Sequence, residues 1–484
     1  MPQAHDIGTT YRAPTGNLTR NCLSFRPSRL DRIAATSSPP IAAGLHAVLT
    51  FHGEQDVARG NGSAMTISAC RSCGGSDLHI ILDLGQHPVS NALLAEDDLL
   101  KEESRYPLMV AFCRDCSLLQ VTETIPPEHL YQRDYPYFSS SSPALLEHAS
   151  ALARKLAQER NLGPTSFVIE VASNDGYLLK NFVELGVPCL GIDPAAGPGE
   201  RARARGVPTI TDFFGLRLAE SLAQQGQFAD VFIANNVLAH VDQINDFVAG
   251  FARLLKPDGI ASFEVAYAVD MIQSCEFDTI YHEHLFYHTL HGLVPLFARH
   301  GLFLNDVELL PIHGGSVRIF VGRDAARTAR LTRQWEEEER LGVDRDDYYV
   351  DFSARVLELK SSLAALLTKE KQNGRRIACY GAAAKGATLL NFLDLGNGFF
   401  DFVADANPFK QGKFMPGQRI PIVHPERLLA DGPDNVLLLS WNFAGEILHQ
   451  QDNYRKAGGR FVIPIPKPRI IGPDDRPSDS QFAL

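Results

Sequence analysis

Short, largely apolar runs alternate with amphipathic stretches through the middle of the chain. They lie at 167–171, 189–193, 231–234 and 260–263, and turn residues bound each of them. Runs of four or five apolar residues separated by helix-length segments are typical of parallel strands whose sheet is covered by helices on both faces. We therefore predict one α/β domain over residues 126–325.

A second pattern of the same kind follows in the C-terminal part of the chain. Residues 377–380 and 436–439 read as buried strands, with helix-length segments between them. This pattern predicts a second, Rossmann-like α/β domain over residues 374–484. The stretch between the two domains, 326–373, is rich in charged residues, and we predict it to be a helical connector.

Residues 1–64 show neither the period of a strand nor that of a helix. They are rich in Ser, Thr, Pro, Ala and Arg. Such a composition cannot bury much apolar surface, so we predict a disordered extension. The alternative is that translation starts at Met65. Residues 65–125 follow as a small module of short strands, and they carry four of the eight cysteines of the chain.

Length and charge narrow the class of protein. A chain of 484 residues exceeds one ordinary core, and three domains of roughly 100–200 residues are expected. The net charge of −11 disfavours nucleic acid as the partner, because phosphate binding needs a basic face. No apolar run reaches the length of about 18 residues that a membrane span requires, and the start does not read as a secretion signal. We expect a cytoplasmic monomer or weak homo-oligomer that binds no membrane.

Two C-x-x-C pairs predict a metal site in the N-terminal module. Cys70 and Cys73 form the first pair, and Cys113 and Cys116 form the second. Each pair can bring two thiolates to one ion, and two pairs complete a tetrahedral site of four sulfurs that suits zinc. Four protein ligands leave no position open for water, so the predicted zinc is structural. Four unconnected free cysteines are the alternative.

A small-residue turn after the strand at 167–171 predicts a cofactor site. It runs from Glu170 through Ala172 and Asn174 to Gly176, and about 20 residues later the next strand ends in Asp193. Backbone amides at such a turn can approach a ligand, and a carboxylate at the second strand end can hold ribose hydroxyls. This layout alone fits both NAD and S-adenosylmethionine. The lack of a G-x-G-x-x-G motif and the extra acid favour the sulfonium cofactor.

A segment dense in proton-transfer groups follows the predicted sheet. Tyr281, His282, Glu283 and His284 are consecutive. A metalloprotease helix needs histidines four residues apart on one face, and Phe286 stands where the second would be. Two interpretations remain open on the residues alone. The segment is either a surface turn with incidental histidines or a general base with groups that orient it.

These motifs together resemble the family of S-adenosylmethionine-dependent sugar C-methyltransferases that carry an N-terminal zinc-binding module. The S-N-D-G turn after Glu170 and the Y-H-E-H segment carry the resemblance, as do H-G-G-S-V-R at 313–318 and G-A-A-A-K-G at 381–386. The resemblance covers residues 66–470. It implies a class I methyltransferase Rossmann-like sheet between the zinc module and the second Rossmann-like domain.

The resemblance also implies which residues hold the cofactor. Besides the turn and Asp193, Asp212 and Phe213 would contact adenine, and Asn235 would line the pocket. The turn departs from the family pattern at Ala172, where glycine is usual.

For the reaction, the resemblance implies C-methylation of a nucleotide-linked keto-sugar through an enolate. His284 would be the base, Tyr281 and Glu283 would orient it or stabilise the enolate oxygen, and Tyr137 would face the sugar. The residues implied to bind substrate are His313, Arg318, Lys385 and Asn407. Lys385 would meet the pyrophosphate at a helix N-terminus.

Two rival functions remain on the sequence. The first is an NAD(P)-dependent oxidoreductase that acts on a nucleotide-sugar and uses the second Rossmann-like domain. The second is a zinc-ribbon module that recruits nucleic acid, and the acidic balance argues against it.

Overall fold

The computed structural model describes residues 65–126, 138–141, 143–312, 314–473 and 475. The predicted extension 1–64, Tyr137 and His313 lie outside the described residues. None of the described helices combines the length and the apolar composition that crossing a membrane requires.

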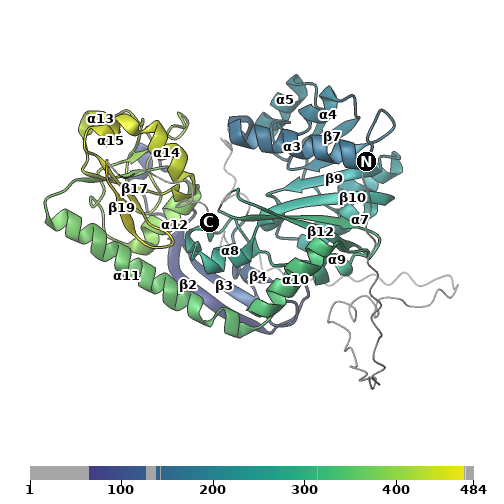
Figure 1. Cartoon of the computed structure of the whole chain (residues 1–484), viewed down its shortest axis with the longest axis horizontal. Helices are drawn as coiled ribbons and strands as arrows, with labels where there is room; N and C mark the ends of the chain where they lie inside the picture. The colour runs from purple at the N-terminus through teal and green to yellow at the C-terminus, as the bar shows by residue number, and fades with distance from the viewer. Residues whose placement is uncertain (1–64, 127–137, 142, 313, 474, 476–484) are drawn as a thin grey trace, which may run out of the picture. The chain divides into compact units, whose positions relative to one another are not determined.

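A seven-stranded sheet forms the central domain. Its order is β12-β13-β10-β9-β6-β7-β8, and Figure 1 shows the labelled strands β12, β10, β9 and β7 following one another in this order. Strands β6 to β10 run parallel, and β13 is antiparallel to both of its neighbours. This arrangement confirms the predicted class I methyltransferase sheet. The strands are β6 (Val168–Val171), β7 (Cys189–Ile192), β8 (Thr209–Ile210), β9 (Ala229–Asn235), β10 (Leu255–Ala266), β12 (Phe303–Leu310) and β13 (Ser316–Gly322).

Amphipathic helices cover this sheet because their apolar side chains recur at helical spacing. In α3 (Pro143–Glu159), the residues Leu145, Ala149, Leu152 and Leu156 are all buried. They join Val168 and Phe182 in one apolar cluster. Burial of each leucine stabilises the fold by about 1.5–3 kcal/mol. The other helices of this domain are α4 (Lys180–Glu184), α5 (Ala196–Ala204), α6 (Leu216–Gln224), α7 (Ile244–Leu254), α8 (Ala268–Gln273) and α9 (Leu290–Ala298).

The sheet of the N-terminal module includes one strand that the central domain contributes. The sheet has the order β11-β4-β3-β2. Strands β2 (Leu78–Pro88), β3 (Arg105–Cys113) and β4 (Leu119–Val121) come from the module, whereas β11 (Phe286–Tyr287) directly follows the Y-H-E-H segment. β11 pairs with β4 in antiparallel register. The sequence pattern did not predict this pairing, because a two-residue strand has no period. Two short strands, β1 (Met65–Thr66) and β5 (Glu123–Thr124), pair beside it.

The C-terminal domain is a second Rossmann-like unit, as predicted. Its sheet has the order β16-β15-β14-β17-β18-β19. This is the doubly wound order 3-2-1-4-5-6, with only β19 antiparallel to its neighbour. The strands are β14 (Ile377–Tyr380), β15 (Val403–Ala404), β16 (Ile422–Val423), β17 (Asn435–Leu438), β18 (Arg460–Ile463) and β19 (Arg469–Ile471). The helices are α12 (Ala384–Leu393), α13 (Arg427–Asp431), α14 (Ala444–Gln450) and α15 (Asp452–Lys456).

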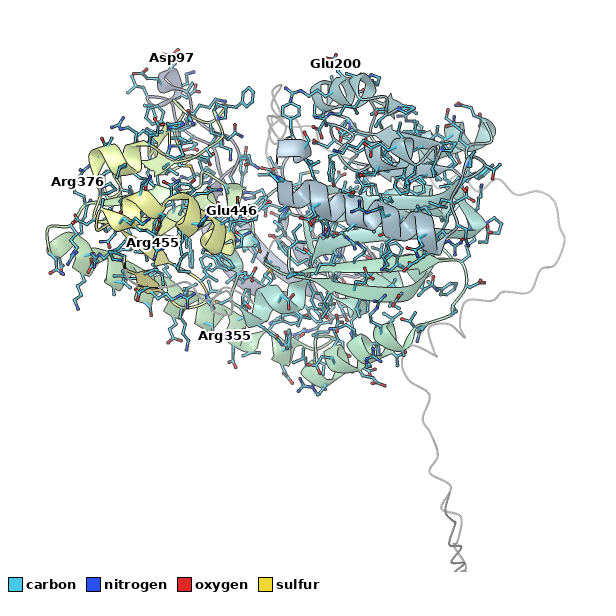
Figure 2. All side chains as sticks on the ribbon, turned by 45° about the horizontal axis from the view of Figure 1, so that its top comes forward. Asp97, Glu200, Arg355, Arg376, Glu446 and Arg455 are labelled. Carbon is cyan, nitrogen blue, oxygen red and sulfur yellow. The ribbon has the colours of Figure 1, made fainter. Side chains whose placement is uncertain are left out.

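Two helices, α10 (Ala329–Leu341) and α11 (Val350–Gln372), span the predicted connector. The carboxylate of Glu338 on α10 is fully buried and accepts hydrogen bonds from the Tyr267 hydroxyl and from the first backbone amides of α9. Arg355 on α11, which is labelled in Figure 2, donates to the carbonyls of Ile272 and Gln273. The connector is therefore bonded to the central domain and is not a free spacer.

Candidate functional site

The four predicted metal ligands lie together. The sulfur atoms of Cys70, Cys73, Cys113 and Cys116 all lie within 4.8 Å of one another, and none of the four is in a disulfide. Backbone amides of Ser72 and Gly75 point at the sulfurs of the first pair, as expected when a turn folds around thiolates. Four sulfurs at this spacing fit one zinc ion and complete its tetrahedral shell, so the zinc is structural.

The turn after β6 takes the left-handed backbone conformation three times. Ala172, Asn174 and Gly176 have φ values of 56°, 47° and 74°. A side chain at Gly176 would come within 3.0 Å of Val207, so this glycine is required by both conformation and space. Ala172 adopts the same conformation with a Cβ atom, which costs about 1–2 kcal/mol.

Asp193 closes this turn from the end of β7. One carboxylate oxygen accepts the Asn174 amide at 2.8 Å, and the other accepts the Ala195 amide at 2.9 Å. Burial raises its pKa, and the two amides oppose that shift. Each carboxylate oxygen can accept further hydrogen bonds, so the side chain remains able to hold ribose hydroxyls.

Several buried polar atoms in and beside the turn lack partners within the described part of the chain, and two of them lie at strand ends. These two are Oε2 of Glu170 and Oδ1 of Asn235, at the ends of β6 and β9. Burial and the nearby carboxylates of Asp193 and Asp175 raise the pKa of Glu170 well above its usual value. A ligand with a positive charge and hydrogen-bond donors would satisfy these acceptors. The residues present therefore fit S-adenosylmethionine, which carries a sulfonium and an ammonium group.

The residues predicted to meet adenine lie on the surface after β8. The Asp212 carboxylate bonds to Arg217 and to the backbone amide of Phe213. Phe213 is 66% exposed, which is unusual for a phenylalanine and leaves its ring able to cover a flat base. Their assignment to adenine stays a prediction.

His284 is held by two contacts on opposite sides of its ring. Nδ1 lies 3.0 Å from the carbonyl oxygen of Thr279, and Nε2 lies 2.6 Å from the Tyr281 hydroxyl. A carbonyl oxygen can only accept, so the proton of a neutral ring is on Nδ1 and Nε2 carries the lone pair. The arrangement thus presents Nε2 as a proton acceptor.

Glu283 is held by a residue that the sequence did not point to. Asn91, in the loop between β2 and β3, donates from Nδ2 to both of its carboxylate oxygens. Burial raises the pKa of Glu283 to about 7, and the Asn91 amide lowers it. Asn91 carries no local motif, and only its contact across 192 positions identifies it.

A second histidine, His240, lies next to the base. The centroids of its ring and the His284 ring are 4.8 Å apart. Burial lowers the pKa of His240 to about 4, so it is neutral at pH 7 and adds no positive charge next to Nε2. His282 points elsewhere, and its Nε2 donates to the Pro107 carbonyl.

Arg318 lies in a buried network of charges. Its guanidinium donates to the Glu264 carboxylate at 2.6 Å and to Glu308 at 3.3 Å, and the ring of His148 lies 2.9 Å away. It is 5% exposed. Its assignment to substrate stays a prediction. The two glutamates give Arg318 a structural role that does not depend on substrate.

Lys385 and Asn407 lie at two turns of the C-terminal domain. The ammonium group of Lys385 lies at the first turn of α12, 3.4 Å from Oδ1 of Asn442. Oδ1 of Asn407 accepts the backbone amide of Phe409, which fixes the turn after β15. Asp405, at the end of β15, accepts the Ala382 amide at 2.7 Å. Their assignment to substrate stays a prediction.

Three family models match successive parts of the chain. The zinc binding domain family matches residues 70–131, a methyltransferase domain family matches 145–305, and the C-methyltransferase C-terminal domain family matches 311–466. Along the chain, the three matches follow the order of the zinc module, the seven-stranded sheet and the C-terminal domain.

Known proteins resemble the chain over different lengths. Ubiquinone biosynthesis O-methyltransferase of Bartonella tribocorum is 25% identical over 117 residues, which are 22% of this chain and 47% of that protein. The solved structure of magnesium protoporphyrin IX methyltransferase (ChlM) from Synechocystis PCC 6803 is 14% identical, covers 37% of this chain and 79% of its own, and has a TM-score of 0.29. The PH0226 protein of Pyrococcus horikoshii OT3 is 15% identical, covers 40% of this chain and 98% of its own, and has a TM-score of 0.32.

One relative matches nearly end to end. C-methyltransferase NovU of Streptomyces niveus is 34% identical over 409 residues, which are 84% of this chain and 97% of the relative. Together with the three family matches and the sheet order, this similarity shows that the chain belongs to the C-methyltransferase family.

Proposed function

We propose that this C-methyltransferase acts on a nucleotide-linked keto-deoxysugar, and that His284 removes the proton next to the ketone. S-adenosylmethionine, when bound, supplies an electrophilic methyl group. The observation that carries the proposal is the orientation of His284, whose Nε2 accepts from the Tyr281 hydroxyl while Nδ1 donates to Thr279. A C-methyltransferase needs a carbanion, and a ketone makes the neighbouring C–H bond acidic enough for an imidazole to remove its proton.

In the proposed step, the base takes a proton and the substrate keeps the electron pair of the C–H bond. The proton passes to Nε2 of His284, and the C–H electron pair forms the double bond of an enolate. The same carbon then takes the methyl group and the ketone re-forms, while the sulfur of the donor would keep the electron pair of the broken S–CH₃ bond and become a neutral thioether. The Tyr281 hydroxyl occupies Nε2 when no substrate is present, so the substrate must displace it. The displaced hydroxyl is then a donor for the enolate oxygen.

The surroundings of His284 favour this role. The neighbouring His240 is neutral at pH 7, so its ring does not oppose protonation of the base. The Glu283 carboxyl, whose pKa burial raises to about 7, is adjacent to the base in sequence and is held by the amide of Asn91. Both groups are held by buried contacts, which supports a preformed site.

The C-terminal domain supplies the features expected for the nucleotide part. Lys385 lies at the N-terminus of α12, where backbone amides and a positive charge suit a diphosphate. Its domain has the doubly wound order that binds nucleotides in other proteins. The oxidoreductase alternative is not retained, because the family is one of methyltransferases.

The test is loss of proton exchange in a His284→Asn variant. We expect the wild type with S-adenosylhomocysteine to exchange the α-hydrogen of the keto-sugar for solvent deuterium, and the variant not to exchange it. Methyl transfer should fall by about 10²–10⁴-fold, the usual contribution of a positioned general base. Binding of S-adenosylhomocysteine should be unchanged. Methylation by His284→Asn at the wild-type rate would exclude this mechanism.

Matched controls separate the base from its neighbours. His449→Asn changes an exposed histidine and should leave methylation unchanged. Tyr281→Phe and Glu283→Gln should each cost less than His284→Asn, because each acts through the base or the enolate oxygen. The substrate class is tested by thermal shift with a panel of nucleotide keto-sugars and the matching free keto-sugars. Stabilisation by the free sugars alone would contradict the nucleotide assignment.

A further inference from the structure

Asp278 is a fully buried carboxyl between the central and the C-terminal domains. It lies in a short 3-10 turn, Phe277–Thr279, and has no exposed surface. Oδ2 accepts the indole N–H of Trp441 at 2.7 Å. Oδ1 lies 3.8 Å from the ammonium group of Lys385 and has no hydrogen-bond partner in the described part of the chain.

Trp441 and Lys385 also contact each other. The Lys385 ammonium lies 4.0 Å from the centre of the Trp441 ring, a favourable cation–π distance. One carboxylate therefore fixes the ring through its N–H, and the ring fixes the cation through its face. The ammonium itself makes one long hydrogen bond, to Asn442 at 3.4 Å, so it keeps donors for another anion.

The turn that carries Asp278 leads directly into the segment of the base. Asp278 lies three residues before Tyr281 and six before His284. Ile280, between them, accepts a hydrogen bond of 3.0 Å from the Thr388 hydroxyl of α12. Lys385 and Thr388 are three residues apart and share one face of that helix. The same short segment is thus tied at one end to Lys385 and at the other to the base.

We propose that Asp278 is a positioning residue, which holds Trp441 and through it Lys385 in place to bind the diphosphate of the substrate. This inference rests on the proposed function, because it takes Lys385 as the diphosphate ligand. It adds two residues, Asp278 and Trp441, that carry no motif and do not touch the substrate in this role.

A purely electrostatic role and a positioning role of Asp278 predict opposite changes in diphosphate affinity when the residue is replaced by alanine, which makes the inference testable. A carboxylate near Lys385 repels an incoming diphosphate, so if that were its only effect, Asp278→Ala would tighten diphosphate binding. If Asp278 positions Trp441 and Lys385, Asp278→Ala weakens binding. Asp278→Asn keeps an oxygen that accepts the indole N–H and should retain most of the affinity.

The experiment is calorimetric titration of the full-length holoenzyme with thymidine diphosphate, uridine diphosphate and inorganic pyrophosphate. We expect Asp278→Ala to weaken nucleoside diphosphate binding about 10-fold or more, the size of a lost buried hydrogen bond of roughly 1.5–3 kcal/mol. Trp441→Phe keeps the ring and removes the N–H, and it should cause a similar loss. The double variant should be no weaker than either single variant, because both remove one contact.

Separate controls test whether each variant folds and whether Lys385 binds the diphosphate. Binding of S-adenosylhomocysteine should be unchanged in every variant. Asp431→Asn changes a half-buried carboxylate paired with Arg427 and should leave diphosphate binding unchanged. Should Asp278→Ala not fold, the comparison of Trp441→Phe with Asp278→Asn decides the question. Equal or tighter binding by Asp278→Ala, or additive losses in the double variant, would overturn the inference. Unchanged binding by Lys385→Met would instead remove the lysine from the diphosphate site, while deuterium exchange still decides the role of His284.

Discussion

The side-chain amide of Asn91 bridges both carboxylate oxygens of Glu283, at 2.8 and 2.9 Å. Asn91 belongs to the N-terminal module, and Glu283 is adjacent to the proposed base. The zinc module thus reaches the site through a side chain as well as through strand β11. We therefore expect the module to complete the segment of the proposed base.

Replacing Asn91 should impair the reaction without affecting the cofactor. Asn91→Ala removes the donor that lowers the pKa of Glu283, so this carboxyl will hold its proton to higher pH. We expect kcat to fall about 10-fold or more, as for loss of one buried hydrogen bond to a charged group, with the rise of kcat shifted to higher pH. Steady-state kinetics across pH measures both. Gln86→Ala, an exposed position in β2, is the control, and an unshifted pH profile in Asn91→Ala would contradict this account.

Removing the metal should abolish activity although no thiolate takes part in the reaction. Elemental analysis should find about one zinc per chain, because four thiolates close one tetrahedral site. Cys113→Ser should lose the zinc and disorder the sheet that contains β11, so methylation is lost. Binding of S-adenosylhomocysteine to the seven-stranded sheet should persist. Cys189→Ala, an isolated buried thiol, should keep its zinc. Full activity of zinc-free protein would refute this coupling.

Asp193 should be a determinant of cofactor affinity. Asp193→Ala removes a carboxylate that closes the cofactor turn and is placed to hold ribose hydroxyls. We expect S-adenosylhomocysteine to bind about 10- to 150-fold more weakly, since a hydrogen bond to a charged group contributes roughly 1.5–3 kcal/mol. Calorimetry gives the affinity, and Asp230→Ala, a carboxylate paired with Lys256, is the control. Wild-type affinity in Asp193→Ala would remove it from the site.

Ala172→Gly should stabilise the protein. Ala172 has a φ of 56°, and a residue without a Cβ atom adopts this conformation at lower cost. The gain should be about 0.5–1 kcal/mol after the larger entropy of glycine in the unfolded chain is subtracted. Urea unfolding measures it, and Ala157→Gly in the helix α3 should instead destabilise. A lower unfolding midpoint for Ala172→Gly would show that the methyl group contributes packing that outweighs the strain.

Glu276 should make stability depend on pH. Burial, with the Asp278 and Asp270 carboxyls, raises its pKa from 4.5 to about 8, and Lys385 opposes this shift. Between those values the unfolded chain releases the proton first, so the contribution of Glu276 to stability falls as pH rises from about 4.5 to 8 and is constant outside this window. The fall attributable to Glu276 is about 5 kcal/mol at most. Glu276→Gln should show a smaller loss between pH 5 and pH 8 in urea unfolding. An identical loss would show that other groups cause it.

Short sequence motifs predicted the parts of the site whose residues lie close together in the sequence. The cysteine pairs, the turn from Glu170 to Gly176 and the strand ended by Asp193 were readable, because each motif places its own ligands within a few residues. The alternation of apolar runs predicted the parallel strands of the central sheet, whereas their order in the sheet is known from the fold. Asn91, Asp278 and the charge network around Arg318 were not readable. Their residue types are common, and only the folded chain brings them beside their partners.

The long-range contacts of the segment that contains β11 have a consequence for folding during synthesis. In the segment of His284, Glu283 bonds to Asn91, which lies 192 positions earlier. Asp278 bonds to Trp441, which lies 163 positions later. Such distant pairings form late, because closing long loops is entropically costly. During synthesis the seven-stranded sheet, which ends at Gly322, can assemble before the C-terminal domain leaves the ribosome. On the proposed mechanism, a nascent chain therefore holds its methyl donor before the segment of His284 is supported, and catalysis waits for the C-terminal domain.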